Sequence, residues 1–344
     1  MNKRHVTLKQ VASSAGVSYQ TVSKVLNRQI QVSKETEDRI MDVARTLGYR
    51  PSFVARSLRA QRAFTIGYSW PPSSPDQENI VLDQFLQSMF LAAEERGYYL
   101  LCFPYHADIN KHLTTYSELI ETRRVDGFVL SNIEYDDPRV SLLLERNFPF
   151  VAFGRSNPDL VFPWIDVDGG LGIRQSVLHL LEKGHRRIAA LAWPLDSRVG
   201  NNRMEGYFSA LKDADITPDE FWIKRGEGVF DFGYKATLEL LELPEDCRPT
   251  AVIALNDMMA LGASQAAKDR GLHVGQDIAV TGFDDAPMVQ YTFPSLTTLR
   301  QPISEIGQRI IAMLIEYINT GAIPQNPNIL VAPQLIVRNS TTKI

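Results

Sequence analysis

The chain has few cysteines and no long apolar run. Only Cys102 and Cys247 occur among its 344 residues, so no disulfide framework is available and a reducing compartment is expected. The opening residues, MNKRHVTLKQ, lack the apolar stretch of a secretory signal. No uninterrupted apolar run is long enough to span a membrane. We therefore expect a cytoplasmic protein with no membrane partner.

Motifs of several common enzyme classes are also missing. The sequence contains no G-x-x-x-x-G-K-[ST] phosphate loop, no nucleophile elbow and no Cys/His spacing typical of a metal site. Acidic residues follow several of the expected strands, but a binding cleft needs polar groups there as well. We therefore expect neither an enzyme nor a bound metal or cofactor.

Charge is distributed unevenly along the chain. The net charge is −4, yet residues 1–62 contain 12 Lys and Arg against 4 Asp and Glu, which leaves 24 basic and 36 acidic residues in the remainder. A basic head on an acidic body is typical of a protein whose head contacts phosphates. The alternative is a solvated basic tail, but this stretch has periodic apolar positions rather than low-complexity charge.

Apolar periodicity in the first fifty residues predicts three helices. Thr7 is placed to cap the first, with Gln10 in capping-box spacing, and Gly16 is placed to end it. Ser18 and Ser33 are placed to cap the second and third. The expected inward positions are Leu8, Val11, Ala12 and Ala15, then Val22, Val25 and Leu26, then Ile40, Val43, Ala44 and Leu47. Two short helices joined by a tight turn and braced by a third form a helix-turn-helix.

The outward face of the second helix is polar. In a helix-turn-helix the N-terminal residues of this helix enter the major groove, where Gln20 can bond adenine and Lys24 can reach the acceptors of guanine. Hydroxyl and amide side chains near the helix starts suit phosphate oxygens, which would fix the register on DNA. These side chains are Thr7, Ser18, Thr21, Ser23, Asn27 and Ser33.

A linker, YRPSFVARSLRAQR, follows at residues 49–62. Pro51 ends the third helix, and Ser52 can cap a short one with Val54, Ala55 and Leu58 on one face. A helix this short is not stable alone in water, so we expect it to fold on a partner, with Leu58 as a wedge in the minor groove. The alternative is a linker helix packed on the body.

The segments VTLKQVASSAGVSYQTVSKVLN and VSKETEDRIMDVARTLGYRPSFVARSLR resemble the head of the lactose-repressor (LacI) family of bacterial transcription regulators. The resemblance implies that Tyr19, Gln20 and Lys24 read bases, and that the hinge pair Ala55 and Leu58 enters the minor groove at the operator's central step. The family often has arginine at the third reading position, so Lys24 is a departure. The resemblance also implies a palindromic operator bound by a homodimer. No leucine-heptad tail follows the last expected strand, which favours a dimer over a tetramer.

From Phe64 onward, short apolar runs alternate with amphipathic stretches such as residues 83–96, 170–181 and 303–319. The runs are FTIGYSW, YYLLCF, VDGFVLS, FPFVAFG, RIAALAW, AVIALN and IAVTGFDD. This alternation, repeated twice, predicts an α/β body of two doubly wound parallel-sheet lobes of the periplasmic-binding-protein type behind the all-α head. We expect a head at 1–50, a hinge at 51–62, a first lobe at 63–166 and 298–328, and a second lobe at 167–297 and 329–344.

Polar residues that follow the strands are candidates for a ligand site, because ligands in such folds bind beyond the carboxyl ends of the strands. The LacI resemblance implies ligand contacts from Asn256, with Asp257 left to cap the next helix, from Asp284, and from Arg203 in the element R-x-x-G-[YW]. After two strands of the first lobe, Arg155 and the aromatic face of Trp164 are further candidates.

Each candidate has a structural alternative. Asp284 fits a turn, Arg203 fits a surface salt bridge, and Trp164, like Trp70 and Phe230, fits a core or a rim. Asp166 and Asp168 suit caps of the helix at 170–181. His185 and Arg186 lie in EKGHRRIA, an element that the LacI resemblance marks as structural.

The sequence therefore predicts a DNA-binding transcriptional regulator, a repressor by resemblance, whose operator affinity depends on a small effector between two lobes. A saccharide is favoured over a purine or an amino acid. One alternative is a sugar-binding protein without a DNA role, but the basic head argues against it. Another is a regulator that responds to a purine or another metabolite. The segment SWPPSSPDQENIV departs from the family's commoner Asn-Pro loop. Whether the effector induces or co-represses stays open.

Overall fold

The computed structural model describes residues 6–26, 30, 32–49, 57, 60–70 and 80–342, with the side chain of Ile80 left out. The chain divides into two compact units, Met1–Ala63 and Phe64–Ile344. This division lies next to the expected end of the linker. Among the described helices, none is both long and apolar enough to cross a membrane.

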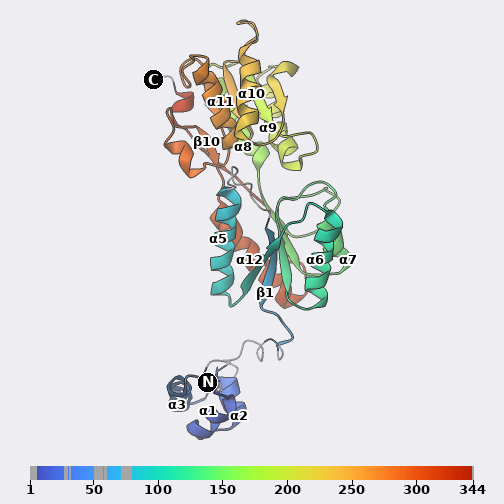
Figure 1. Ribbon diagram of the computed structural model, residues 1–344, viewed down its shortest axis with the longest axis vertical. Coiled ribbons are helices and arrows are strands. Elements are labelled where there is room, and N and C mark those ends of the chain that lie inside the picture. Colours follow the sequence, from blue (N-terminus) through green and yellow to red (C-terminus); the bar gives the residue numbers. More distant parts are fainter. Residues whose placement is uncertain are drawn as a thin grey trace. The chain divides into compact units, whose positions relative to one another are not determined.

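The first unit contains three helices, α1 (Leu8–Ala15), α2 (Tyr19–Leu26) and α3 (Lys34–Leu47) (Figure 1). The predicted caps are confirmed: Thr7 and Gln10 form both halves of a capping box, and Gly16 ends α1 with φ 66°. The hydroxyls of Ser18 and Ser33 accept from the backbone N–H groups three residues on. The buried core is Val11, Ala12, Ala15, Val22, Val25, Ile40 and Ala44.

One prediction for this unit is wrong, and others concern residues that the structure does not describe. Leu47, predicted to face inward, is exposed at the last turn of α3. The hinge residues Ala55 and Leu58, and the phosphate candidate Asn27, lie outside the described residues.

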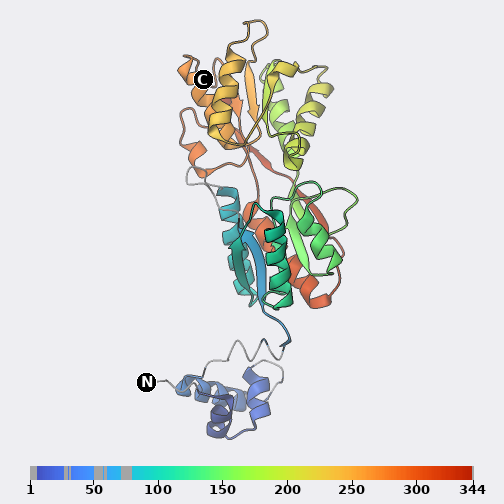
Figure 2. The ribbon, with the colours of Figure 1, turned by 45° about the vertical axis from the view of Figure 1, so that its right-hand side comes forward.

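The first lobe of the second unit is a parallel sheet with strand order β11-β5-β4-β3-β1-β2. Helices α5 and α12 lie side by side on one face of this sheet, and α6 and α7 cover the other (Figures 1 and 2). The strands are β1 (Thr65–Trp70), β2 (Tyr99–Pro104), β3 (Gly127–Leu130), β4 (Phe150–Phe153), β5 (Trp164–Val167) and β11 (Asn328–Val331). The helices are α5 (Ile80–Glu95), α6 (Ile109–Glu121), α7 (Pro138–Glu145) and α12 (Ile303–Thr320).

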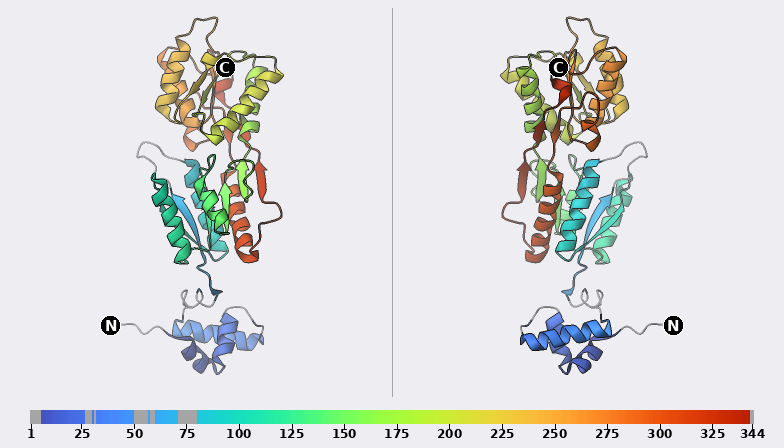
Figure 3. Two further views of the ribbon diagram at one scale, coloured as in Figure 1. Left: turned by 90° about the vertical axis from the view of Figure 1, so that its right-hand side faces the viewer. Right: turned by 90° about the vertical axis from the view of Figure 1, so that its left-hand side faces the viewer.

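The second lobe is a parallel sheet with strand order β7-β6-β8-β9, flanked by the helix pairs α8 with α9 and α10 with α11 (Figure 3). Its strands are β6 (Ile188–Ala192), β7 (Ile223–Arg225), β8 (Ala251–Ala254) and β9 (Ala279–Thr281). Its helices are α8 (Gly169–Glu182), α9 (Arg198–Asp213), α10 (Phe230–Leu241) and α11 (Asp257–Asp269). An antiparallel pair, β10 (Thr298–Arg300) with β12 (Gln334–Ile336), packs on α8. The predicted fold class is confirmed, and each of the seven apolar runs overlaps a strand.

The chain crosses between the lobes at three places, and two of them differ from the expected boundaries. The first crossing, between β5 and α8, agrees with the expected change at residue 167. Expected boundaries at 298 and 329 would place β10 in the first lobe and most of β11 in the second. Strand pairing instead joins β10 to β12 and β11 to β5. An apolar run predicts a strand but does not reveal which sheet edge it joins.

Candidate functional site

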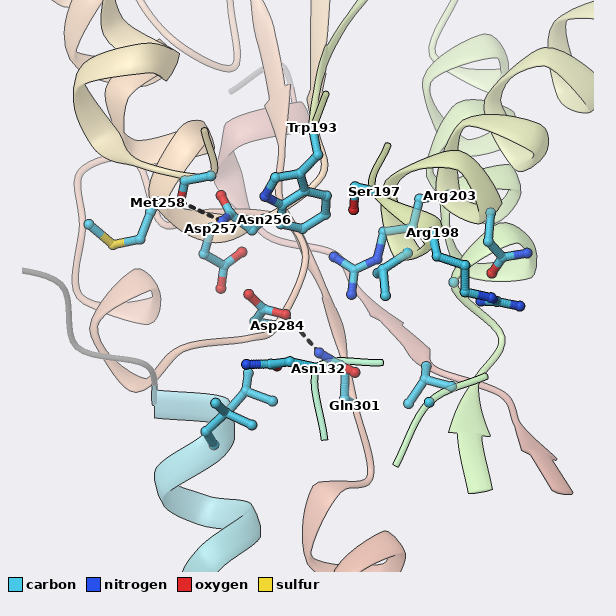
Figure 4. Close-up of a pocket in the computed structure, with 18 of the residues that line it drawn as sticks. Asn132, Trp193, Ser197, Arg198, Arg203, Asn256, Asp257, Met258, Asp284 and Gln301 are labelled. Atoms are coloured by element: carbon cyan, nitrogen blue, oxygen red, sulfur yellow. Dashed lines mark hydrogen bonds between the residues drawn. The ribbon is translucent and has the colours of Figure 1, made fainter. Parts of the chain in front are cut away.

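A cleft of about 1330 Å³ lies within the second unit, lined by residues from both lobes (Figure 4). Segments that follow β1, β3, β4, β6 and β8 contribute side chains or backbone to its walls. The prediction rested on this geometry, since the carboxyl ends of parallel strands point their following loops at a common space. Three of the five predicted effector residues line the cleft: Arg203, Asn256 and Asp284.

Arg203 is buried in the cleft wall rather than placed in a surface salt bridge. Its side chain comes from α9, is 6% exposed, and donates from Nη1 to the backbone carbonyl of Leu255. The guanidinium lies 3.5 Å from the centroid of the Phe283 ring and 5.1 Å from that of Trp193. Burial lowers the pKa of Arg203. Its Nε is buried and has no hydrogen-bond acceptor among the described residues.

Asp284 faces the same space as Arg203 (Figure 4). Its carboxylate accepts from Gln301 Nε2 at 2.7 Å, and its backbone has a φ of 123°, a conformation that non-glycine residues rarely adopt. Burial raises the pKa of Asp284 to about 6, with Arg203 acting in the opposite direction. Asp284 lies in an isolated bridge with Arg300 rather than in a turn, and its predicted contact with a ligand stays a prediction.

Asn256, rather than Asp257, caps helix α11. Asn256 Oδ1 accepts from the N–H of Met259 at 2.8 Å, while its Nδ2 donates to the carbonyl of Gly228 at 2.7 Å. The assignment of the cap to Asp257 is therefore wrong. The Asp257 carboxylate instead accepts from the N–H of Ala286 and the hydroxyl of Thr298. Burial, and then the charge of Asp284, raise the pKa of Asp257 well above its usual range.

Arg155 and Trp164 do not line the cleft, contrary to the prediction. Arg155 Nε donates to Asp166 at 2.7 Å, and its guanidinium lies 5.5 Å from the centroid of the Trp164 ring. Asp166, which itself lines the cleft, holds Arg155 in an ion pair and is not a helix cap. Asp168 alone caps α8, by accepting from the N–H of Leu171.

Several lining side chains were not among the predicted residues. Trp193 follows β6 and Asn132 lies two residues beyond β3, so the strand-end rule would have found both. Gln301 lies on the crossing after β10, where no periodic pattern marks it. Of the other aromatic residues considered, Trp70 and Phe230 line the cleft.

The head presents the polar face that the sequence predicts. Tyr19, Gln20 and Lys24 are exposed on α2, whereas Val22 and Val25 are buried behind them. The hydroxyls of Ser18 and Thr21 lie 2.8 Å apart at the start of this helix. Thr7, Ser23 and Ser33 are also placed in or before the head helices, as expected.

Two family descriptions match the chain. Residues 7–52 match "Bacterial regulatory proteins, lacI family", and residues 177–341 match "Periplasmic binding protein-like domain". The transcriptional repressor PurR of Erwinia tasmaniensis is 35% identical over 339 residues, which cover 97% of this chain and 96% of PurR. The chain belongs to the lacI family. It is a DNA-binding transcriptional repressor of that family, whose members are regulators rather than enzymes, so the resemblance and the exclusion of an enzyme are confirmed.

Solved structures of lacI-family proteins agree over most of their length. A regulatory protein from Chloroflexus aggregans is 51% identical with a TM-score of 0.78, covering 81% of this chain and 98% of that one. The lac repressor dimer bound to operator and an anti-inducer is 29% identical with a TM-score of 0.82, covering 99% of this chain and all of that one. A complex of the regulator CelR with cellobiose is 30% identical with a TM-score of 0.73, covering 98% and 100%.

Proposed function

We propose that this protein represses transcription as a homodimer on a palindromic operator, and that a saccharide bound in the cleft controls its operator affinity. The similarity to the lac repressor dimer bound to operator supports the dimer, because two half-sites related by a two-fold axis need two heads. If ligand binding changes the separation of the lobes, it would change how the two heads of the dimer contact their half-sites and hence the operator affinity.

The presence of Arg203 and Asp284 on the same cleft wall carries the saccharide proposal. An arginine only donates hydrogen bonds and a carboxylate only accepts them, whereas a sugar hydroxyl does both. A hydroxyl placed between the guanidinium of Arg203 and the carboxylate of Asp284 could accept from the first and donate to the second. Trp193, half-buried beside them, offers a flat apolar face to a sugar ring (Figure 4). The similarity to CelR, solved with cellobiose, supports the same class of ligand.

For DNA, the proposal assigns base reading to Tyr19, Gln20 and Lys24, which are exposed together on α2. Phosphate contacts go to Thr7, Ser18, Thr21, Ser23, Asn27 and Ser33, and the minor-groove contact to Ala55 and Leu58.

Selection of an operator from a random duplex library, followed by fluorescence anisotropy, tests the DNA-reading assignment. Gln20→Ala should cost about 1–3 kcal/mol on the selected duplex and relax one base position. The matched control is Thr46→Ala, an exposed polar residue on α3, which should change the binding free energy by less than about 0.5 kcal/mol. Equal effects of the two substitutions, or no loss of base preference with Gln20→Ala, would contradict the assignment.

A further inference from the structure

The cleft is acidic. Its described lining contains eight carboxylates but only two cationic side chains. The carboxylates are Glu134, Asp166, Asp196, Glu227, Asp231, Asp257, Asp284 and Asp285, and the cations are Arg198 and Arg203.

Two of the carboxylates are neutralised by arginines. Asp166 pairs with Arg155 at 2.7 Å and with Arg198 at 3.6 Å. Asp285 pairs with Arg300 at 2.6 Å and with Arg338 at 2.7 Å, so two arginines offset its charge.

The acidity of the cleft comes mainly from three other carboxylates. Asp196, Glu227 and Asp231 are exposed, and no described Lys or Arg forms an ion pair with any of them. Asp257 and Asp284 line the same wall as Arg203, but burial raises the pKa of both, while the charge of Arg203 acts in the opposite direction on Asp284. Arg203 is therefore the one lining cation, in the described part of the chain, that has no carboxylate within ion-pair distance.

The helix N-termini of the second lobe, which would otherwise bind an anion, already have carboxylates beside them. Free N–H groups and the helix dipole make such a terminus attractive to phosphate. Asp168 accepts from the N–H of Leu171 at the start of α8, and Glu134 accepts from the N–H of Arg198, the first residue of α9, at 2.6 Å. Asp231 and Asp257 lie in the first turns of α10 and α11.

Arg203 is also unsuited to an anion. One end of its guanidinium donates to the Leu255 carbonyl, and its face lies against Phe283. A phosphate or carboxylate is best held by two parallel N–H groups, but Nη1 is taken by the Leu255 carbonyl and Nε is buried, so neither pair of parallel donors is available to a ligand in the cleft. A single free donor opposite a carboxylate matches a neutral hydroxyl.

We propose that the effector is an uncharged saccharide and that the cleft excludes sugar phosphates and other anions. This inference rests on the saccharide proposal above and deepens it by fixing the charge of the ligand. A phosphate monoester carries a charge of about −1.5 to −2 at neutral pH, so it would be repelled by Glu227 and Asp231 and would find no paired N–H donors in return.

Isothermal titration calorimetry with matched pairs at 0.15 M salt tests the inference on the full chain. The probes are cellobiose, maltose, trehalose and sucrose, each beside its 6-phosphate, together with adenosine and inosine beside their 5′-monophosphates. For any sugar that binds, we expect the phosphorylated partner to bind at least about tenfold more weakly, equivalent to about 1.4 kcal/mol. A sugar phosphate that binds as tightly as its neutral partner, or more tightly, would overturn the exclusion while leaving the saccharide function in place.

A double variant shows whether the exposed carboxylates Glu227 and Asp231 cause the preference for the neutral sugar over its phosphate. Glu227→Gln with Asp231→Asn should reduce the ratio of the Kd of the sugar phosphate to the Kd of the neutral sugar at least about threefold. The matched control, Glu94→Gln with Glu118→Gln, removes two charges from exposed positions outside the cleft and should leave the ratio unchanged. Equal Kd ratios in the two double variants would contradict the repulsion of phosphate by Glu227 and Asp231. Binding of a nucleoside and of no sugar would overturn the saccharide proposal, and the nucleoside pairs would still test the exclusion of phosphate.

Discussion

Asp284 and Asp285 are neighbours in sequence, yet replacing each by asparagine should change stability in opposite directions. Asparagine at position 284 keeps the oxygen that accepts from Gln301 and removes a carboxylate that burial disfavours. Asparagine at position 285 removes the charge that Arg300 and Arg338 share, and Arg338 is only 16% exposed. The first change relieves an electrostatic cost, and the second creates one.

The magnitude follows from the pKa of Asp284, which burial raises from 3.8 to about 6. One pKa unit corresponds to 1.36 kcal/mol, so the charged carboxylate costs at most about 3 kcal/mol. Removing the charge of Asp284 also removes its attraction to Arg203, which reduces the gain. We therefore expect Asp284→Asn to stabilise the second unit by about 1–3 kcal/mol at pH 8. A raised pKa imposes its full cost above about pH 6 and none once both states are protonated, so the gain should shrink from pH 6 toward pH 4.

Urea unfolding followed by tryptophan fluorescence measures these differences. All four tryptophans, Trp70, Trp164, Trp193 and Trp222, lie in the second unit, so the signal reports this unit alone. Asp285→Asn should destabilise by about 2–4 kcal/mol, because it leaves the largely buried Arg338 without its charge partner. Destabilisation by Asp284→Asn at pH 8, or a gain that does not depend on pH, would refute the electrostatic reasoning.

Two further substitutions probe the cleft wall and the helix packing behind it. Trp193→Ala should weaken saccharide binding by about 1–2 kcal/mol in calorimetry, because it removes the aromatic face beside Arg203; unchanged affinity would contradict the stacking role. Gly206→Ala should destabilise the second unit by more than about 3 kcal/mol in urea, since the added Cβ would lie 1.9 Å from the carbonyl oxygen of Gly170, where α9 meets α8. A stability near wild type would show that the two helices separate easily.

Features determined by neighbours in sequence were predictable. The caps at Thr7, Ser18 and Ser33 depend on residues three positions away, and the buried strands depend on runs of apolar residues. The cleft followed from a rule about where parallel strands end. That rule agrees with the position of Asp284 on the cleft and, if applied to every strand, would also have indicated Trp193, whereas Arg203, inside α9, was indicated only by the family resemblance.

Features determined by tertiary partners were not predictable. Asn256 and Asp257 are both good caps, and the choice between them was made by Ala286 and Thr298, which bind the Asp257 carboxylate from distant positions. Arg155 has the chemistry of a ligand-binding residue, but Asp166 lies close enough to engage it. The lobe boundaries near β10 and β11 depended in the same way on which strands they pair with.

The central claim is that a saccharide in the cleft and an operator at the head affect each other's affinity. Anisotropy titrations of the selected operator, with and without a saturating saccharide identified by calorimetry, measure this coupling directly. We predict that the saccharide changes the operator Kd at least about fivefold, that the operator changes the saccharide Kd by the same factor, and that Asp284→Asn binds operator without responding. A saccharide that binds the wild-type cleft and leaves the operator Kd unchanged would contradict the claim.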